Sequence, residues 1–137
     1  MKNKMNRFHI ALSACLLTSL ALASSLAAAE MTSEDKQFLA QYEEVRIALA
    51  ADDLAEAKKA ATAMGETGAP MAQSETIAAA RKEFATLSAR ALQVTAGHDG
   101  YYHVNCPMLK KDWVQTTDKI SNPYAGKSML TCGVIKK

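Results

Sequence analysis

The sequence predicts a mainly α fold, in which three antiparallel helices precede an irregular C-terminal region with short β segments. Two observations predict it. Apolar residues recur at helical spacing over residues 33–96. Beyond Gly97 this period stops, and aromatic, β-branched and turn-forming residues replace it. We expect one domain over residues 30–137, with helices at about 33–96 and a sulfur-rich region at about 98–137.

The first helix is predicted from Ser33 to about Ala51. Its apolar residues recur at spacings of four, three and four: Phe38, Tyr42, Val45 and Leu49. Ser33 is placed to cap the first turn, where Glu34 and Asp35 complement the helix dipole.

Asp52 and Asp53 interrupt the period, so one of them is expected to cap a second helix that runs to Met64. The very short link predicts that these two helices are antiparallel. The turn-forming residues 65–70 then break the chain. Ser74 is expected to cap a third helix that Gly97 ends, with apolar positions at three-four spacing: Ile77, Ala80, Phe84, Leu87, Ala91 and Val94.

The region after Gly97 has a different character. Tyr101–Val104 is strand-like, whereas prolines and glycines punctuate the rest. Trp113 is the only tryptophan, and its ring is expected to cover a small core rather than to attract a cation.

Residues 1–29 are predicted to form a cleavable export signal. It begins with three basic residues: Lys2, Lys4 and Arg7. An apolar stretch over 10–26 and three alanines precede the expected cleavage before Glu30, a pattern that favours cleavage over a membrane anchor. Leu12–Cys15 is similar to a lipobox, but the apolar run before Cys15 is short, so we do not expect a lipoprotein.

Signal removal changes the charge of the chain. Three of the 16 lysines and arginines lie in the signal and none of the 14 acidic residues does, which leaves a net charge of −1. We therefore expect no nucleic-acid partner and no membrane insertion after cleavage. Phosphate-binding loops, nucleophile elbows, haem-attachment motifs and Cys-x-x-Cys motifs are all missing, so the sequence does not predict an enzyme.

Sulfur is concentrated in the last third of the chain. Cys106-Pro107-Met108 and Met129-Leu130-Thr131-Cys132 hold both cysteines that remain after export. Thiolates and thioethers suit Cu(I) or Ag(I) better than hard cations, and His103 adds an imidazole three residues before Cys106. Thiolate binding displaces a proton, so metal affinity should fall in acid.

Other interpretations of the same residues stay open at this point. Two cysteines in an oxidising compartment commonly form a disulfide, or they can be independent buried thiols. Met108 and Met129 can instead fill gaps in the core. A zinc site would need His98 and His103 together with the cysteines, at a spacing that matches no compact zinc motif.

The C-terminal region resembles a bacterial exported family. It contains four elements in this order: Tyr102-x3-Cys106-Pro107-Met108, Trp113, Ile120-x-Asn122-Pro123-Tyr124-x-Gly126 and Met129-Leu130-x-Cys132-Gly133. These are similar to domain-of-unknown-function family 3347, which occurs as small periplasmic proteins and appended to adaptor subunits of copper and silver efflux pumps. The resemblance implies a soluble periplasmic domain associated with heavy-metal resistance.

The sequence thus predicts a periplasmic Cu(I) or Ag(I) binding protein that buffers the metal or delivers it to an efflux system, with the adaptor as a possible partner. The expected primary ligands are Cys106 and Cys132, the softer ones Met108 and Met129, and His103 an optional fifth. The alternative is a non-catalytic structural or interaction domain in which Cys106 and Cys132 form a disulfide.

Overall fold

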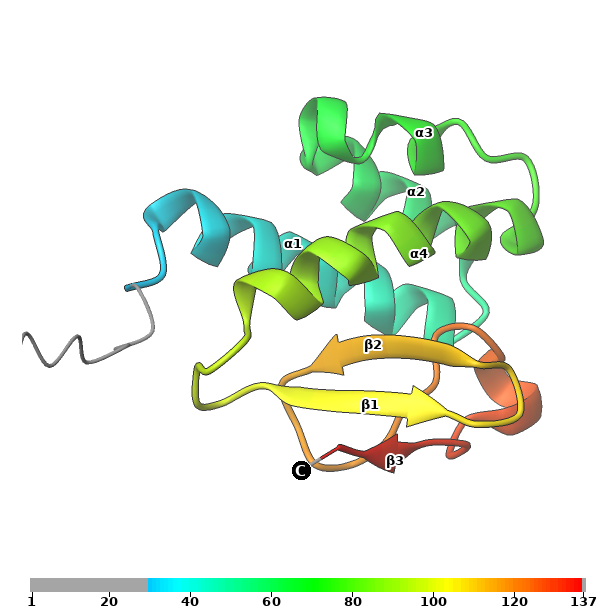
Figure 1. Ribbon diagram of the computed structural model, residues 1–137. Helices are drawn as coiled ribbons and strands as arrows, with labels where there is room; N and C mark the ends of the chain where they lie inside the picture. The colour runs from blue at the N-terminus through cyan, green and yellow to red at the C-terminus, as the bar shows by residue number, and fades with distance from the viewer. Residues whose placement is uncertain (1–29, 137) are drawn as a thin grey trace, which may run out of the picture.

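A computed structural model describes residues 30–136 of the chain (Figure 1). The predicted export signal and the Cys15 lipobox lie outside these residues. Four helices come first: α1 (Ser33–Ala50), α2 (Leu54–Ala63), α3 (Ala69–Ala72) and α4 (Ile77–Val94). The fold is mainly α, as the sequence predicts. Among the described residues, no helix is long and apolar enough to cross a membrane.

The helices α1 and α2 form a tight hairpin. Asp53 caps α2, since its side chain accepts a hydrogen bond from the Glu56 N–H. Asp52 has φ 60°, in the left-handed region that lets the chain reverse between the helices. The cap of α1 is Thr32 rather than the expected Ser33, because the Thr32 hydroxyl reaches the Asp35 N–H at 3.1 Å.

The connection between α2 and α4 is more ordered than the sequence predicts. Instead of a simple break, a 3₁₀ turn (Gly65–Thr67) leads into the short α3. A Cβ at Gly68 would lie within 3 Å of the Ala61 backbone, so glycine permits this close return. The expected Ser74 cap is wrong: Thr76 caps α4, while the Ser74 hydroxyl bonds back to Pro70.

The C-terminal region contains the expected short β segments, which assemble into one antiparallel sheet. Its strands are β1 (Tyr102–Cys106), β2 (Lys111–Gln115) and β3 (Val134–Ile135), in the order β2-β1-β3. A 3₁₀ helix, η2 (Gly126–Met129), precedes β3. The sheet lies against one side of the helices (Figure 1).

One hydrophobic core joins the helices to the sheet. A series of rings runs through it, with centroids 5.0 Å apart for Tyr42 and Phe84, 5.4 Å for Phe84 and Tyr124, and 6.3 Å for Tyr124 and Trp113. Trp113 is fully buried. Its ring therefore covers the small core, as the sequence suggests.

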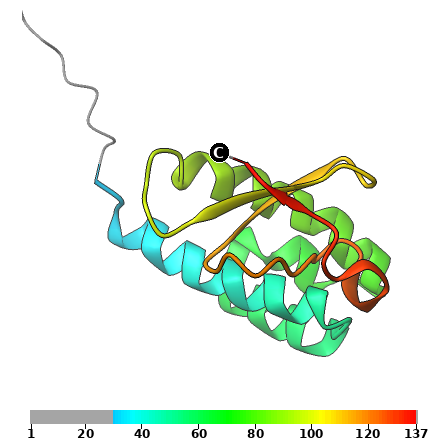
Figure 2. The same ribbon diagram turned by 90° about the horizontal axis from the view of Figure 1, so that it is seen from below.

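Two arginines fasten the segment between β2 and η2 to the helices. Arg46 of α1 donates to the Ser121 carbonyl at 3.0 Å. Arg81 of α4 donates to the Pro123 carbonyl at 2.8 Å and to Asp52 at 2.6 Å. Figure 2 shows this segment running beside α1. The helical half thus positions the loop that leads to Cys132.

Candidate metal centre

The two cysteines that remain after the predicted export meet at one end of the sheet. The sulfur atoms of Cys106 and Cys132 are 2.7 Å apart, although 26 residues separate them in sequence. Both carry free thiols; Cys106 is fully buried and Cys132 is half-buried. The pair is reachable from solvent only through Cys132.

Strand pairing produces this contact. Cys106 is the last residue of β1, and side-chain alternation puts it on the same buried face as Val104. β3 begins two residues after Cys132 and pairs antiparallel with β1, with Val134 opposite Asn105. Because of this register, Cys132, at the end of the turn over residues 129–132, lies next to Cys106, at the end of β1.

Tight packing fixes Cys132 in place. A Cβ on Gly133 would lie 2.8 Å from a Val104 methyl carbon and 3.0 Å from the Trp113 ring, so only glycine fits beside the cysteine. The buried Asn122 amide donates to the Cys132 carbonyl at 2.8 Å.

Asn122 is a positioning residue to which the sequence analysis assigned no role. Its side-chain oxygen accepts hydrogen bonds from the Tyr124 and Ala125 N–H groups at 2.9 and 3.1 Å. Asparagine commonly bonds the backbone two residues ahead in a turn, so the Asn-Pro-Tyr run carried the signal. The Asn122 bond to Cys132, ten residues away, required the fold.

The two thiols have different proton affinities. Burial alone would raise the pKa of Cys106, but hydrogen bonds from the Cys132 thiol and from the Leu109 and Met108 N–H groups outweigh it, and this pKa is lowered. The hydrogen bond to Cys106 raises the pKa of Cys132, and burial adds to this effect. Cys106 is therefore the thiol of the pair that loses its proton more readily, with Cys132 as the S–H donor to it, and the pair loses its protons in two steps.

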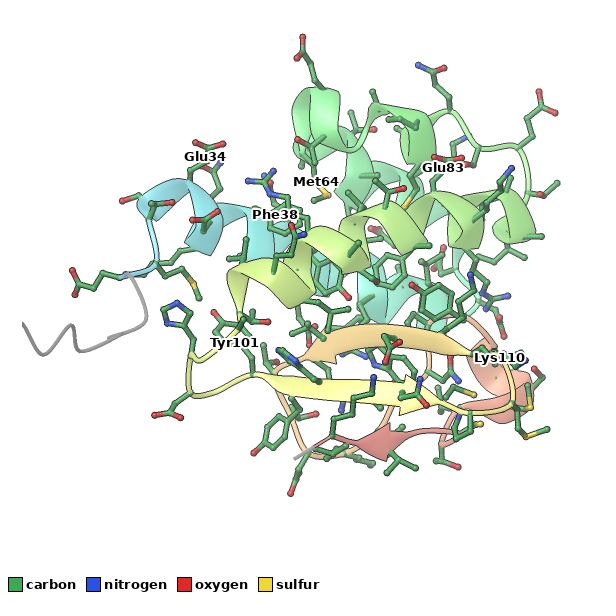
Figure 3. The ribbon with its side chains drawn as sticks, in the orientation of Figure 1. Glu34, Phe38, Met64, Glu83, Tyr101 and Lys110 are labelled. Atoms are coloured by element: carbon green, nitrogen blue, oxygen red, sulfur yellow. The ribbon has the colours of Figure 1, made fainter. Side chains whose placement is uncertain are left out.

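The two methionines flank the pair. Met108 lies in the turn after β1, where its N–H faces the Cys106 sulfur while its side chain is 74% exposed. Met129 ends η2 and is half-buried, and its backbone carbonyl accepts a hydrogen bond from the Cys132 N–H at 3.0 Å. Figure 3 shows sulfur atoms gathered at this end of the sheet, near Lys110. The structure thus brings Cys106 and Cys132 into contact and places Met108 and Met129 in the two turns that flank them.

His103, the fifth predicted ligand, is not brought to the sulfurs. It is three positions from Cys106 along β1, about 10 Å at strand rise, and faces the opposite side of the strand. Its Nε2 is 2.8 Å from the Thr95 hydroxyl, so this nitrogen is already engaged in a hydrogen bond. Over residues 30–136, no three His, Cys, Asp or Glu side chains group together, so the zinc arrangement with His98 does not form.

The donor set that remains is soft: two thiols and two nearby thioethers. Metal–sulfur bonds of about 2.3 Å would hold two sulfurs about 4 Å apart, wider than the 2.7 Å seen here. A disulfide would need about 2 Å. The half-exposed Cys132 side chain therefore has to move outward to bind a metal and inward to form a disulfide.

Comparisons of the chain with protein-family models, with curated proteins and with solved structures found no match. The resemblance to domain-of-unknown-function family 3347 therefore stays a prediction from the C-terminal motifs. The sulfur pair, its hydrogen bonds and its access to solvent are the observations on which a function can be argued.

Proposed function

We propose that this chain is an exported, periplasmic Cu(I) or Ag(I) binding protein that buffers the metal or hands it to an efflux system. The observation that carries the proposal is the contact between Cys106 and Cys132, two thiols from distant segments that meet at 2.7 Å. The periplasmic location, and the efflux adaptor as the expected partner, are inferred from the resemblance to family 3347.

The environment of the pair favours a soft metal ion. N–H groups from the turn after β1 stabilise negative charge on Cys106, which metal binding requires because the ligand is the thiolate. Met129 and Met108 lie next to the pair and offer thioethers, which retain a soft lone pair in an oxidising compartment. Hard cations prefer clustered oxygen ligands, and residues 30–136 contain no group of three His, Cys, Asp or Glu side chains that could supply them.

The solvent exposure of the site is appropriate for a metal ion that is transferred to another protein. Cys106 is buried at the bottom of the site, whereas Cys132 is half-exposed and Met108 is largely exposed. An incoming thiolate can therefore reach the metal from the Cys132 side and displace ligands one at a time.

The second candidate function is a structural domain tied by a Cys106–Cys132 disulfide. The short sulfur separation favours it, because a small rotation of Cys132 would suffice to form the bond. This candidate assigns Met108 no role, whereas the metal proposal uses its thioether.

The two candidates are separated by thiol counting and metal titration. Protein isolated from the periplasm is denatured and its reactive thiols are counted, and the reduced protein is titrated with Cu(I) against a chelator of known affinity. We expect the reduced protein to bind one Cu(I) at least about a hundredfold more tightly than the Cys106→Ser, Cys132→Ser variant, because losing only a hydrogen-bond partner of a metal ligand already costs about 10- to 100-fold in affinity. Equal affinities of the two proteins would refute the metal proposal, and a fully oxidised pair in the isolated protein would favour the structural candidate.

A further inference from the structure

Positive charge gathers at the end of the molecule that holds the sulfur pair. Lys110 and Lys111 follow the turn after β1, Lys127 lies in η2, and Lys82 lies near the start of α4. Figure 1 shows this turn, η2 and the start of α4 at the same end. Among residues 30–136, none of these four lysines is in an ion pair.

Two of the carboxylates nearby are already neutralised. Asp52 is paired with Arg81, and Asp112 is paired with Lys136. Glu83, although next to Lys82 in sequence, lies on the side of α4 that faces away from the sheet (Figure 3). The local field is therefore positive even though the chain without its signal is almost neutral.

Apolar surface lies among these lysines. Met108 is 74% exposed and Leu130 is 38% exposed, each two residues from one of the paired cysteines. Beside the same turn is a hollow of about 390 Å³ between α4 and the sheet. It is lined by both charged and apolar residues: Ala78, Arg81, Lys82, Leu109, Lys111 and Tyr124.

An apolar centre inside a cationic rim is the pattern of a protein interface that selects its partner by charge. Charges of one sign around a contact speed association with the opposite sign and disfavour partners of like sign. Apolar side chains in the centre supply contact area. The hollow beside Leu109 offers a place for an apolar side chain, with Lys82 and Lys111 available for adjacent carboxylates.

We propose that this basic face, formed by Lys82, Lys110, Lys111 and Lys127 around Met108 and Leu130, docks a partner protein through an acidic segment that carries carboxylates beside an apolar side chain. The inference rests on the proposed function, because docking here brings the partner's own metal ligand next to Cys132. The docking inference goes beyond the metal site because it specifies the chemistry of the partner's surface.

The test uses reduced, metal-free protein and two short peptides. One peptide has glutamates around a central methionine and leucine, and the other has lysines in place of the glutamates. We expect the acidic peptide to shift NMR amide signals around Lys110, Lys127 and Leu130. The Lys110→Glu, Lys127→Glu variant should weaken this binding by about tenfold, and added salt should weaken binding to the unmodified protein.

A matched control reverses two lysines on α2, Lys58 and Lys59, which lie away from the sulfur pair. The Lys58→Glu, Lys59→Glu variant should bind the acidic peptide like the unmodified protein. Equal binding of the two peptides, or equal weakening by both double variants, would overturn the docking proposal. So would binding of vesicles rich in anionic lipid without binding of the acidic peptide, since that result assigns the face to a membrane surface.

A parallel Cu(I) titration keeps the two proposals separate. The Lys110→Glu, Lys127→Glu variant should retain its Cu(I) affinity within about twofold, because exposed charges near a site act weakly on a bond between metal and sulfur. If the unmodified protein fails to hold Cu(I) yet binds the acidic peptide selectively, the metal function fails and the interface stands. If it holds Cu(I) and ignores the peptide, the interface alone fails.

Discussion

The hydroxyl oxygen of Tyr42 accepts a hydrogen bond of 3.1 Å from the backbone N–H of Val114, and so ties α1 to β2. The same hydroxyl is 3.0 Å from the Ser88 hydroxyl on α4, so three elements meet at one buried atom. Burial raises the pKa of Tyr42, and its hydroxyl therefore stays protonated. This hydroxyl is a buried polar link between the helices and the sheet that carries the sulfur pair.

Replacing Tyr42 by phenylalanine should destabilise the protein by about 1–3 kcal/mol, because the Val114 N–H and the Ser88 hydroxyl lose a buried partner. Urea unfolding followed by circular dichroism measures the change. Tyr101→Phe is the matched control, since the Tyr101 hydroxyl reaches only a methionine sulfur at 3.8 Å. An equal loss in both variants would contradict the role given to Tyr42.

Replacing Asn122 by alanine should loosen the turn that holds Cys132, because three hydrogen bonds to backbone groups disappear. We expect a loss of about 2–4 kcal/mol in the unfolding free energy. We also expect faster alkylation of Cys132 in the folded, reduced protein, which a mass-spectrometric time course measures. Asn105→Ala, which removes longer hydrogen bonds between the central strand β1 and β2, should leave the alkylation rate unchanged.

Stability should depend on pH through Asp52. The hydrogen bond from Arg81, together with that from the Lys127 N–H, lowers the pKa of Asp52 below its usual 3.8. The folded state therefore binds this proton less readily than the unfolded state, and the stabilisation is present above about pH 4 and lost as the pH falls through the lowered value. Asp52→Asn keeps a residue that tolerates the left-handed backbone but loses the charge.

The Asp52→Asn variant should accordingly be less stable than the unmodified protein at neutral pH, and the two should converge in acid. Urea unfolding at a series of pH values provides the comparison. Asp99→Asn, in an exposed turn, should match the unmodified protein at neutral pH. A gap between Asp52→Asn and the unmodified protein that persists unchanged in strong acid would rule out the charge as its cause.

His103 should prove dispensable for metal binding. His103→Ala should keep the Cu(I) affinity within about twofold and cost about 1 kcal/mol of stability, since the Thr95 hydroxyl loses its partner. Met129→Leu, with similar volume but no thioether, should lower the Cu(I) affinity measurably. Competition titration of both variants reports the result, and a larger loss of Cu(I) affinity in His103→Ala than in Met129→Leu would reverse the ligand assignment.

Oxidation of the pair should stabilise the fold. Closing the loop between Cys106 and Cys132 reduces the entropy of the unfolded chain, and for a separation of 26 residues we expect about 3.5 kcal/mol. Thermal unfolding with and without a thiol reductant measures the difference. The Cys132→Ser variant, which cannot form this disulfide, should unfold at the same temperature with and without the reductant. No change in the unmodified protein would mean that the disulfide cannot form in the folded state.

Much of the helical half could be predicted because its signals are local. The spacing of Phe38, Tyr42 and Val45 places α1, and Asp53 marks the start of α2. The expected caps of α1 and α4 were each off by one or two residues, because several Thr and Ser side chains compete for the same N–H groups. The short α3 was missed because its glycines and proline favour a break, whereas packing against Ala61 stabilises a helical return.

The site could be predicted only in part, for a physical reason. The soft donor residues could be identified from the sequence. The contact between Cys106 and Cys132, however, depends on the pairing of β3 with β1, which is a long-range property of the fold. His103 was expected as a ligand from its nearness in sequence, whereas strand alternation turns it to the other face. The lowered pKa of Cys106 depends on N–H groups of a turn whose geometry the sequence does not specify.

The burial of Trp113 gives the sulfur site an intrinsic optical reporter. It is the only tryptophan, it is fully buried, and its ring lies next to Gly133, the residue that follows Cys132. Its fluorescence should therefore be blue-shifted in the folded state and should be excited in part by energy transfer from Tyr124, 6.3 Å away. A backbone displacement of Cys132 alters the contact between Gly133 and this indole, so emission intensity can follow the sulfur pair without an added dye.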